Sequence, residues 1–298
     1  MAFGRLVDLR IGTDPRSNSA IKVSELDVAF EVERSIYFGK GGSAEITIFN
    51  AGESTRQMCC RKGAGVELRV GYEDSRNRPG VIFSGNIISG MSSHSAGDWI
   101  TKIKASSGRP VGKVLEATVL SVSYSAGTPA ADVLADVAAL LGFALTGVRM
   151  TGVNMPNGYT DAVVSSVMIE NLRKILAANG YGLYADNNEL VVYAAGEIGD
   201  LVISHLTPDT GLLKVSKVED ATERTKAINA KRKKNKVDAE STMGLVEFTS
   251  LIYPELQPNK VVRLTAPDFT GTTLVESIKY KGDNMGKEWI AECKALYR

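Results

Sequence analysis

IISGMSSHSAGDWITKIKA, residues 87–105, is matched near the C-terminus by SIKYKGDNMGKEWIAECKA, residues 277–295. When Trp99 is placed on Trp289, both stretches contain the pattern Trp-Ile-x-x-x-Lys-Ala, and the only two tryptophans of the chain coincide. Each stretch is typical of a strand, a polar turn and a return strand that begins at Trp. We therefore predict two equivalent hairpins, each packing its tryptophan against a barrel interior.

The same gap-free alignment places Ile88 on Ile278. A chance match between two unrelated hairpins is the alternative, but internal duplication is the favoured interpretation. Duplication is useful to a protein that must match a ring with twice as many subunits. Three copies of such a chain would present six barrels, and closed cyclic rings are a common outcome when unlike surfaces meet.

Composition describes an ordinary globular chain. Its 298 residues are 44% hydrophobic and 23% charged, and no apolar run approaches the roughly 18 residues of a membrane helix. We expect a soluble protein of three domains. Residues 1–5 do not resemble the start of a secretory signal, and three cysteines fit a reducing compartment better than a disulfide framework. The net charge of +1 predicts no general attraction to nucleic acid or to acidic membranes.

The predicted fold class is mainly β, with a small α+β middle domain. Residues 1–108 alternate apolar and polar side chains in several runs and predict a first antiparallel barrel. Residues 109–197 form the predicted middle domain, and residues 198–298, where alternation returns, form a second barrel. The loop at 39–43 contains glycine and lysine, but it joins two strands and is therefore read as a hairpin loop, not a phosphate-binding loop.

The middle domain is the helical part of the prediction. Thr128 is expected to cap a helix with Pro129 at its first position. The apolar stripe of this helix is predicted to be Val133, Val137, Leu140, Leu141 and Ala144. A second helix is expected at about 165–179, followed by a β-hairpin that turns at 186–188.

The chain resembles the baseplate hub proteins of contractile-tailed phages, of the tail hub or late control protein D-like kind. The resemblance covers nearly the whole chain and rests on the order and spacing of short motifs, each weak alone. These motifs are AEITIFN at 44–50, STR at 54–56, KG at 62–63, VELRVGY at 66–72, IFSGNI at 82–87, YSAGTPA at 124–130, GY at 180–181, DTGLL at 209–213 and KGD at 281–283.

The resemblance implies a structural, non-enzymatic protein of the virion baseplate, assembled in the bacterial cytoplasm. It implies two tail-tube-like antiparallel barrels per chain and a homotrimer with approximate sixfold symmetry that joins the hexameric tail tube to the central trimeric spike. The other implied partners are a tube-initiator protein, further baseplate proteins, the tape measure protein and, transiently, DNA in the lumen. Relative to longer members of this group, neither an appended lysozyme nor a spike extension is expected.

No catalytic, cofactor-binding or metal-binding residue is predicted. His94 and His205 are not at metal-ligand spacing from Cys59, Cys60 or Cys293, and no context supports a Cys-His nucleophile. The pairs Glu31 with Glu33 and Asp132 with Asp136 are the candidates for the acid and base of a glycan hydrolase. A solvated role is favoured over catalysis for both pairs, because Glu31 and Glu33 are expected on the outer face of a strand and Asp132 and Asp136 on the polar side of a helix.

The basic run Lys231–Lys236, KRKKNK, has three interpretations. It is a solvated loop, or it contacts a protein neighbour, or it contacts DNA. A nucleic-acid-binding multi-barrel module and a cell-wall hydrolase are the rival functions. Aromatic residues make up only 7% of the chain and none lies in the basic run, which counts against base stacking.

Overall fold

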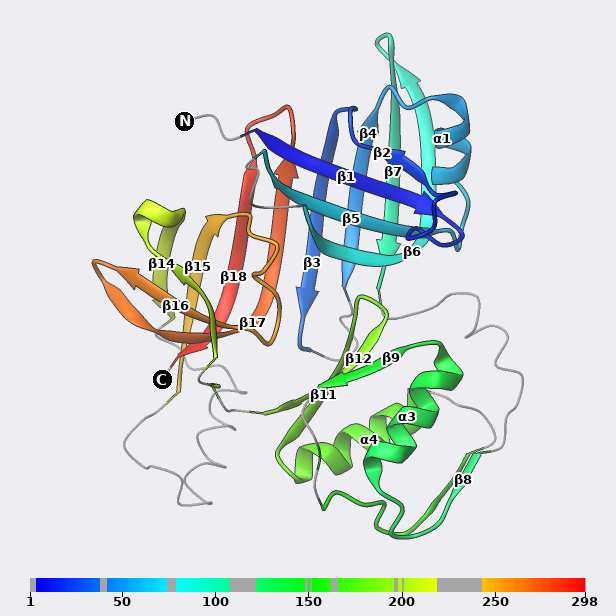
Figure 1. Ribbon diagram of the computed structural model, residues 1–298, viewed down its shortest axis with the longest axis vertical. Coiled ribbons are helices and arrows are strands. Elements are labelled where there is room, and N and C mark those ends of the chain that lie inside the picture. Colours follow the sequence, from blue (N-terminus) through cyan, green and yellow to red (C-terminus); the bar gives the residue numbers. More distant parts are fainter. Residues whose placement is uncertain are drawn as a thin grey trace.

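The computed structural model describes residues 4–37, 42–73, 79–107, 122–147, 150, 152–161, 166–195, 198–199, 201–218 and 243–297. Within these ranges the protein is mainly β, which confirms the predicted fold class. Two strand sets lie side by side, and a smaller helical domain lies below them (Figure 1). In the described part of the chain, no helix is long and apolar enough to cross a membrane.

The first strand set alternates buried and exposed residues, as a half-buried sheet requires. In β3, for example, Val28, Phe30 and Val32 are buried while Glu31 and Glu33 are exposed. The elements are β1 (Arg5–Gly12), β2 (Ile21–Val23), β3 (Val28–Ser35), β4 (Ser43–Phe49), α1 (Glu53–Cys59), β5 (Gly65–Tyr72), β6 (Gly80–Ser95) and β7 (Asp98–Ser106). The antiparallel pairing of β3 with β4 agrees with a hairpin loop at 39–43, of which only Gly42 and Ser43 lie among the described residues.

The second strand set follows the same alternation. In β18 the side chains of Trp289, Ala291 and Cys293 are buried, and those of Glu292 and Lys294 lie on the other face. The elements are β13 (Val202–Leu206), the 3-10 turn η1 (Pro208–Thr210), β14 (Leu212–Val218), β15 (Gly244–Leu251), β16 (Val261–Ala266), β17 (Phe269–Asp283) and β18 (Trp289–Tyr297).

A seam between β3 and β17 joins the two strand sets. The described strands form one thirteen-stranded sheet with the path β14-β15-β18-β17-β3-β4-β7-β6-β5-β1-β2, and β16 and β13 extend it from β17. The two sets are thus parts of one sheet, and the pairings of the described strands do not close either set into a separate barrel. One apolar cluster runs through both sets, from Leu9 and Val66 to Val262 and Cys293.

Side chains reinforce the seam at one end. The Arg5 guanidinium donates to the carbonyl oxygens of Asp283 and Gly286, both at 2.7 Å. The Asn284 side chain accepts from the Val28 amide at 2.7 Å and donates to the Leu26 carbonyl at 2.9 Å. These bonds lie at the end of the β3–β17 pairing, where β17 turns toward β18, and they satisfy backbone groups that make no bond between the strands.

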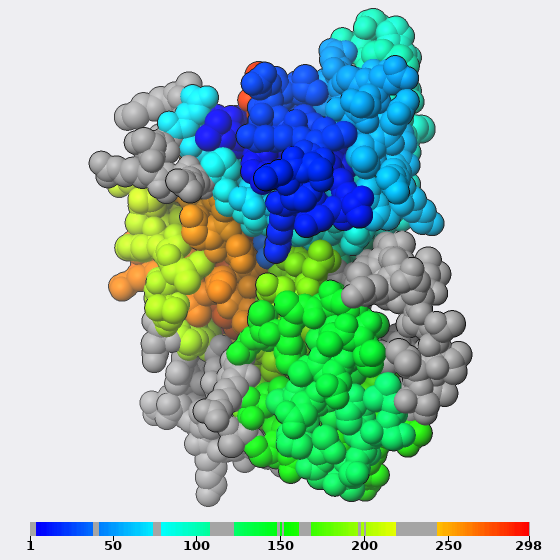
Figure 2. Space-filling model, turned by 45° about the vertical axis from the view of Figure 1, so that its right-hand side comes forward, coloured from blue at the N-terminus to red at the C-terminus, as the bar shows by residue number. Residues whose placement is uncertain are grey.

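The middle domain has its own apolar cluster, formed by two helices against a small sheet. Its elements are β8 (Val122–Tyr124), α3 (Ala130–Leu141), β9 (Ala144–Gly147), β10 (Tyr159–Asp161), α4 (Ser166–Ala178), β11 (Tyr181–Asp186) and β12 (Glu189–Ala194). Figure 2 shows this domain, in green, below the blue first strand set. The domain boundaries at 108 and 197 stay a prediction.

Helix α3 begins differently from the prediction. Pro129 is the N-cap residue, and no side chain caps the helix. Thr128 lies one residue before this N-cap, and its hydroxyl donates to the Ser125 carbonyl at 2.8 Å, within the preceding turn. Leu140 is exposed and Ala144 lies in β9, so both are outside the buried stripe; Val133, Val137 and Leu141 do belong to it. Gly142 ends the helix with φ +76°, a conformation that glycine favours.

The β11–β12 hairpin attaches the middle domain to the sheet. Asn187 and Asn188 both have positive φ, as a two-residue hairpin turn requires. From this turn Asp186 forms an ion pair with buried Arg34 of β3, and the Asn187 side chain accepts from the Ser84 amide of β6 at 2.8 Å. Burial by itself would lower the pKa of Arg34, but the charge of Asp186 and its hydrogen bonds raise it. The guanidinium therefore stays charged in this interface.

We expect the substitution Asp186→Ala to destabilise the protein by about 3–5 kcal/mol, because it leaves the Arg34 guanidinium buried without its partner. Urea unfolding followed by circular dichroism measures the loss. Glu45→Ala is the matched control: it removes the partner of Lys104 from an ion pair that is 65% exposed on both sides and costs about 1 kcal/mol or less. Equal losses for the two variants would contradict this account of the interface.

Candidate functional site

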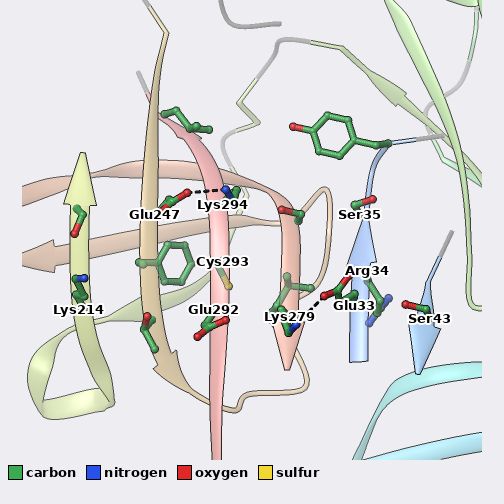
Figure 3. Close-up of a pocket in the computed structure, with 17 residues that line it drawn as sticks. Glu33, Arg34, Ser35, Ser43, Lys214, Glu247, Lys279, Glu292, Cys293 and Lys294 are labelled. Carbon is green, nitrogen blue, oxygen red and sulfur yellow. Dashed lines mark ion pairs between the residues drawn. The ribbon is translucent and has the colours of Figure 1, made fainter. Parts of the chain in front are cut away.

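One face of the large sheet carries charged side chains, while the opposite face is apolar. The charged face runs across β14, β15, β18, β17, β3, β4 and β7 to β6. Its part from β14 to β4 forms a hollow of about 740 Å³, lined by residues that include Lys214, Glu247, Lys294, Lys279 and Glu33. Figure 3 shows these side chains projecting from neighbouring strands into the same space.

Acidic and basic side chains of this face pair across strands. Glu247 lies 2.7 Å from Lys294, Glu292 lies 3.0 Å from Lys281, and Glu45 lies 2.7 Å from Lys104. Lys279 of β17 reaches Glu31 at 2.5 Å and Glu33 at 2.9 Å, across the seam to β3. The hydrogen bonds that Lys279 donates to both glutamates raise its pKa. Such exposed pairs add little stability, so their main effect is a face on which positive and negative charges alternate.

The ion pairs reveal how far the internal repeat extends. Lys104 of β7 lies opposite Glu45 of β4, and Lys294 of β18 lies opposite Glu247 of β15. The lysine of the Trp-Ile-x-x-x-Lys-Ala signature therefore has the same partner in both copies. The sequence carried a signal for this partner: AEITIF at 44–49 and VEFTSL at 246–251 share Glu and Thr at the same offsets.

The repeat also includes a turn with unusual backbone geometry. Gly63 and Asn259 both have positive φ, +85° and +63°. The Gly63 amide donates to the Ile87 carbonyl and the Asn259 amide to the Val275 carbonyl, each at 2.8 Å. The two strand sets are thus equivalent in β5 and β16 as well as in the signature strands. This agreement in backbone detail favours duplication over a chance match of two hairpins.

The register corrects one predicted match. Ile87 lies opposite Ala105 and Ser89 opposite Lys104, so Ile88 is a bulge residue. Val275 lies opposite Ala295 and Ser277 opposite Lys294, so Glu276 is the bulge of the second copy. The structural partner of Ile88 is therefore Glu276, and the predicted match with Ile278 is wrong. The cause is the turn, because the residues between Gly282 and Trp289 outnumber those between His94 and Trp99 by two.

The two tryptophans occupy equivalent strand positions but different surroundings. Trp289 is 2% exposed and packs against Phe30 at 5.7 Å and Tyr72 at 6.2 Å between ring centroids, across the seam. Trp99 is 38% exposed, with the Arg56 guanidinium 3.9 Å from its ring centroid. The prediction that both pack into a barrel interior is wrong for Trp99, because the described chain places no strand set beside its hairpin.

The candidate carboxylate pairs do not form the acid and base site of a glycan hydrolase. Glu31 and Glu33 both bind Lys279 on the charged face. Asp136 lies on the exposed side of α3, where the Tyr124 hydroxyl contacts it at 3.4 Å, and Asp132 belongs to the first turn of the same helix. Their surroundings are those of solvated or ion-paired groups.

The cysteines and histidines are not brought together. Cys59 and Cys293 are buried and Cys60 is exposed. Burial raises the pKa of Cys59 to about 12 and also raises the pKa of Cys293, so both stay protonated thiols at neutral pH. His94 lies beside Trp99, and His205 contacts the Thr265 hydroxyl at 2.9 Å. Among the described residues, no cluster of three His, Cys, Asp or Glu could hold a metal ion.

The basic run Lys231–Lys236 lies outside the described residues. Its role as a solvated loop, a contact for a protein neighbour or a contact for DNA stays a prediction. Among the large apolar side chains of the described ranges, Trp99 is the one exposed aromatic, which gives single-stranded nucleic acid no row of rings to stack on.

Residues 43–264 match the model of a protein family described as baseplate hub gp41. No curated protein matches the chain.

Several solved structures share the fold. A tail protein from Neisseria meningitidis MC58 is 12% identical with a TM-score of 0.65, covering 99% of this chain and 97% of that one. The 43 kDa tail protein of prophage MuSo2 from Shewanella oneidensis is 11% identical with a TM-score of 0.61, covering 98% of both chains. The E. coli c3393 protein, described as a component of the type VI secretion system similar to the T4 tail proteins gp27 and gp5, is 10% identical with a TM-score of 0.59, covering 97% and 76%.

The different surroundings of the tryptophans predict different costs of removal. Trp289→Ala should destabilise the chain by about 3–5 kcal/mol, since it empties a buried site. Trp99→Ala should cost about 1 kcal/mol or less, the worth of an exposed cation–π contact. Denaturant unfolding of both variants measures this, and similar losses would refute the assignment of Trp289 to the interior of the seam.

Thiol reactivity tests the burial of the cysteines. At pH 7 to 8 one thiol per chain, Cys60, should react with an aromatic disulfide reagent, and all three should react after unfolding. Because the pKa of Cys59 is raised to about 12, its reaction should remain slow until the pH approaches that value. The variant Cys60→Ser should abolish the native reaction. Rapid reaction of a second thiol in this variant at pH 8 would contradict the prediction.

Proposed function

The chain belongs to the baseplate hub gp41 family, and from that membership we propose that three copies form the ring that joins the tail tube to the central spike. At the coarser level, the protein is a structural component of the phage tail baseplate and not an enzyme. The proposal adds the trimer, its approximate sixfold symmetry, and a lumen through which the genome passes.

The observation that carries the proposal is the duplication within the chain. The two strand sets repeat the bulge, the signature hairpin, the glutamate–lysine pair and the turn with positive φ. A chain that contains two equivalent units can match a sixfold tube with three copies and a threefold spike with the same three copies. Symmetry adaptation of this kind explains why duplication would be kept.

The charged face suits the wall of the proposed lumen. A wall of uniform positive charge would bind DNA and resist its passage, since each neutralised phosphate adds to the affinity. On this face four described lysines are instead paired with glutamates: Lys104, Lys279, Lys281 and Lys294. These pairs reduce the net positive charge that the wall presents to DNA.

The proposed position of the ring, between tail tube and spike, implies its partners. The tail tube or a tube-initiator protein would lie on one side of the ring and the trimeric spike on the other, with further baseplate proteins and the tape measure protein as neighbours. DNA contact would be transient. The middle domain, predicted at 109–197 between barrels at 1–108 and 198–298, projects from the sheet (Figure 1), and in the proposed ring it would contact the spike or neighbouring baseplate proteins.

Imaging of the chain with its cognate spike or tube protein tests the proposal. We expect rings of three copies with six similar lobes by electron microscopy, and a mass of three chains per hub by native mass spectrometry. A chain that stays monomeric in the complex and in assembled baseplates would overturn the proposal. A gel-shift assay with double-stranded DNA is the companion test, and no shift is expected at physiological salt.

A further inference from the structure

The two strand sets differ most in what lies beside their signature hairpins. On β17 the outer edge from Ser277 to Asp283 is paired with β3. The equivalent edge of β6, from Ser89 to Ser95, pairs with β7 on one side and has no strand on the other within the described chain. The second half of β6 is accordingly exposed, whereas the second half of β17 is largely covered.

The complementary edge, on β14, also has no partner strand among the described residues. Strand registers make β14 the equivalent of β3, because β14 pairs with β15 as β3 pairs with β4. The outer edge of β3 is covered by β17, but β14 ends the sheet and its outer edge has no strand partner among the described residues. The chain therefore carries one internal seam and both halves of a second seam.

We infer that β14 of one copy pairs antiparallel with the outer edge of β6 of a second copy, repeating between chains the β3–β17 seam within the chain. The inference rests on the proposed ring and names the edges through which that ring closes. Addition of a strand to an exposed edge is a common mode of protein association, because main-chain hydrogen bonds supply the affinity. The two edges are unlike surfaces, so the contact can propagate around a ring.

The repeat fixes the register of this second seam. Lys281 lies opposite Glu31 in the internal seam, and the equivalent residues are Ser93 of β6 and Ser216 of β14. By the same mapping, Lys279 opposite Glu33 becomes Met91 opposite Val218. Ser93 would thus lie opposite Ser216, and Met91 opposite Val218, of the neighbouring copy.

The exposed apolar side chains agree with this register. Met91 is 62% exposed and lies on the charged face of β6, at the position where β17 has Lys279. An apolar contact with Val218 of the neighbour would replace the internal ion pair of Lys279 with Glu33. Trp99 is equivalent to Trp289, which the internal seam buries, so a strand beside the β6–β7 hairpin would bring a neighbour to its exposed ring.

Disulfide trapping in assembled baseplates tests the inference. In a Cys60→Ser background, the pair Ser93→Cys with Ser216→Cys should form disulfides between chains on oxidation, giving covalent dimers and trimers on a non-reducing gel. Six strands separate β6 from β14 within one chain, so the bond should join different copies. The pair Ser89→Cys with Ser216→Cys, four residues out of register, should give about tenfold less product, because about 13 Å separates its positions.

The internal seam supplies a matched positive control. Lys281→Cys with Glu31→Cys occupies the equivalent place and should oxidise within one chain. If this control oxidises, and baseplates with three hub copies show no interchain bond for Ser93 with Ser216, the inference is overturned while the proposed ring stands. If the baseplates contain no threefold hub, both are overturned.

Hydrogen exchange of the unmodified chain gives an independent readout. The amides of Ser89–Ser95 and Leu212–Val218 that face outward should gain protection together when the chain assembles. Protection of the β6 edge alone would show that another partner covers it, and would overturn the pairing with β14.

Discussion

The pairing of β3 with β17 is the interaction on which the rest of the structure depends. It places the two strand sets in one sheet, buries Trp289 against Phe30 and Tyr72, and brings Lys279 to the glutamates of β3. It also makes the charged face continuous from β14 to β6. Without this seam the two strand sets would not form one continuous sheet.

The β3–β17 seam fixes the geometric relation between the two repeated units. A repeated unit with a defined edge-to-edge contact sets a rotation between copies, and the same rotation applied repeatedly gives a closed ring or a helix. The chain uses one such contact internally and leaves unlike edges exposed at β6 and β14. Long exposed edges are a liability in a monomer, which is a physical reason to expect that assembly covers them.

Much of the fold could be predicted from the sequence. Alternation in β3 and in β18 identified the strands, and the signature from Trp99 to Ala105 located the repeat because cross-strand packing leaves a pattern of residue types. The helix α4 and the hairpin turn at Asn187 were also predictable from local signals. The charged face could also have been predicted, because residues 44–49 and 246–251 share a Glu and a Thr, and this Glu is the partner of the signature lysine in both copies.

Other features leave no local signal. The β3–β17 seam is paired through backbone groups, and the side chains that cross it lie about 250 residues apart in the sequence, so no local pattern predicts it. The different burial of Trp99 and Trp289 is a consequence of this long-range pairing. The match of Ile88 with Ile278 failed because a longer turn shifts the strand before it while leaving the tryptophans aligned. Thr128 does not cap helix α3 because the helix begins one residue later than predicted, with Pro129 as its N-cap.

The most direct measurement is a cryo-electron microscopy reconstruction of the assembled baseplate, with the rotation between successive strand sets read around the ring. We expect six similar strand sets from three chains, related by about 60° at internal and intermolecular seams alike. Three chains whose strand sets do not follow one another around a common axis, or a hub with a different number of copies, would contradict it.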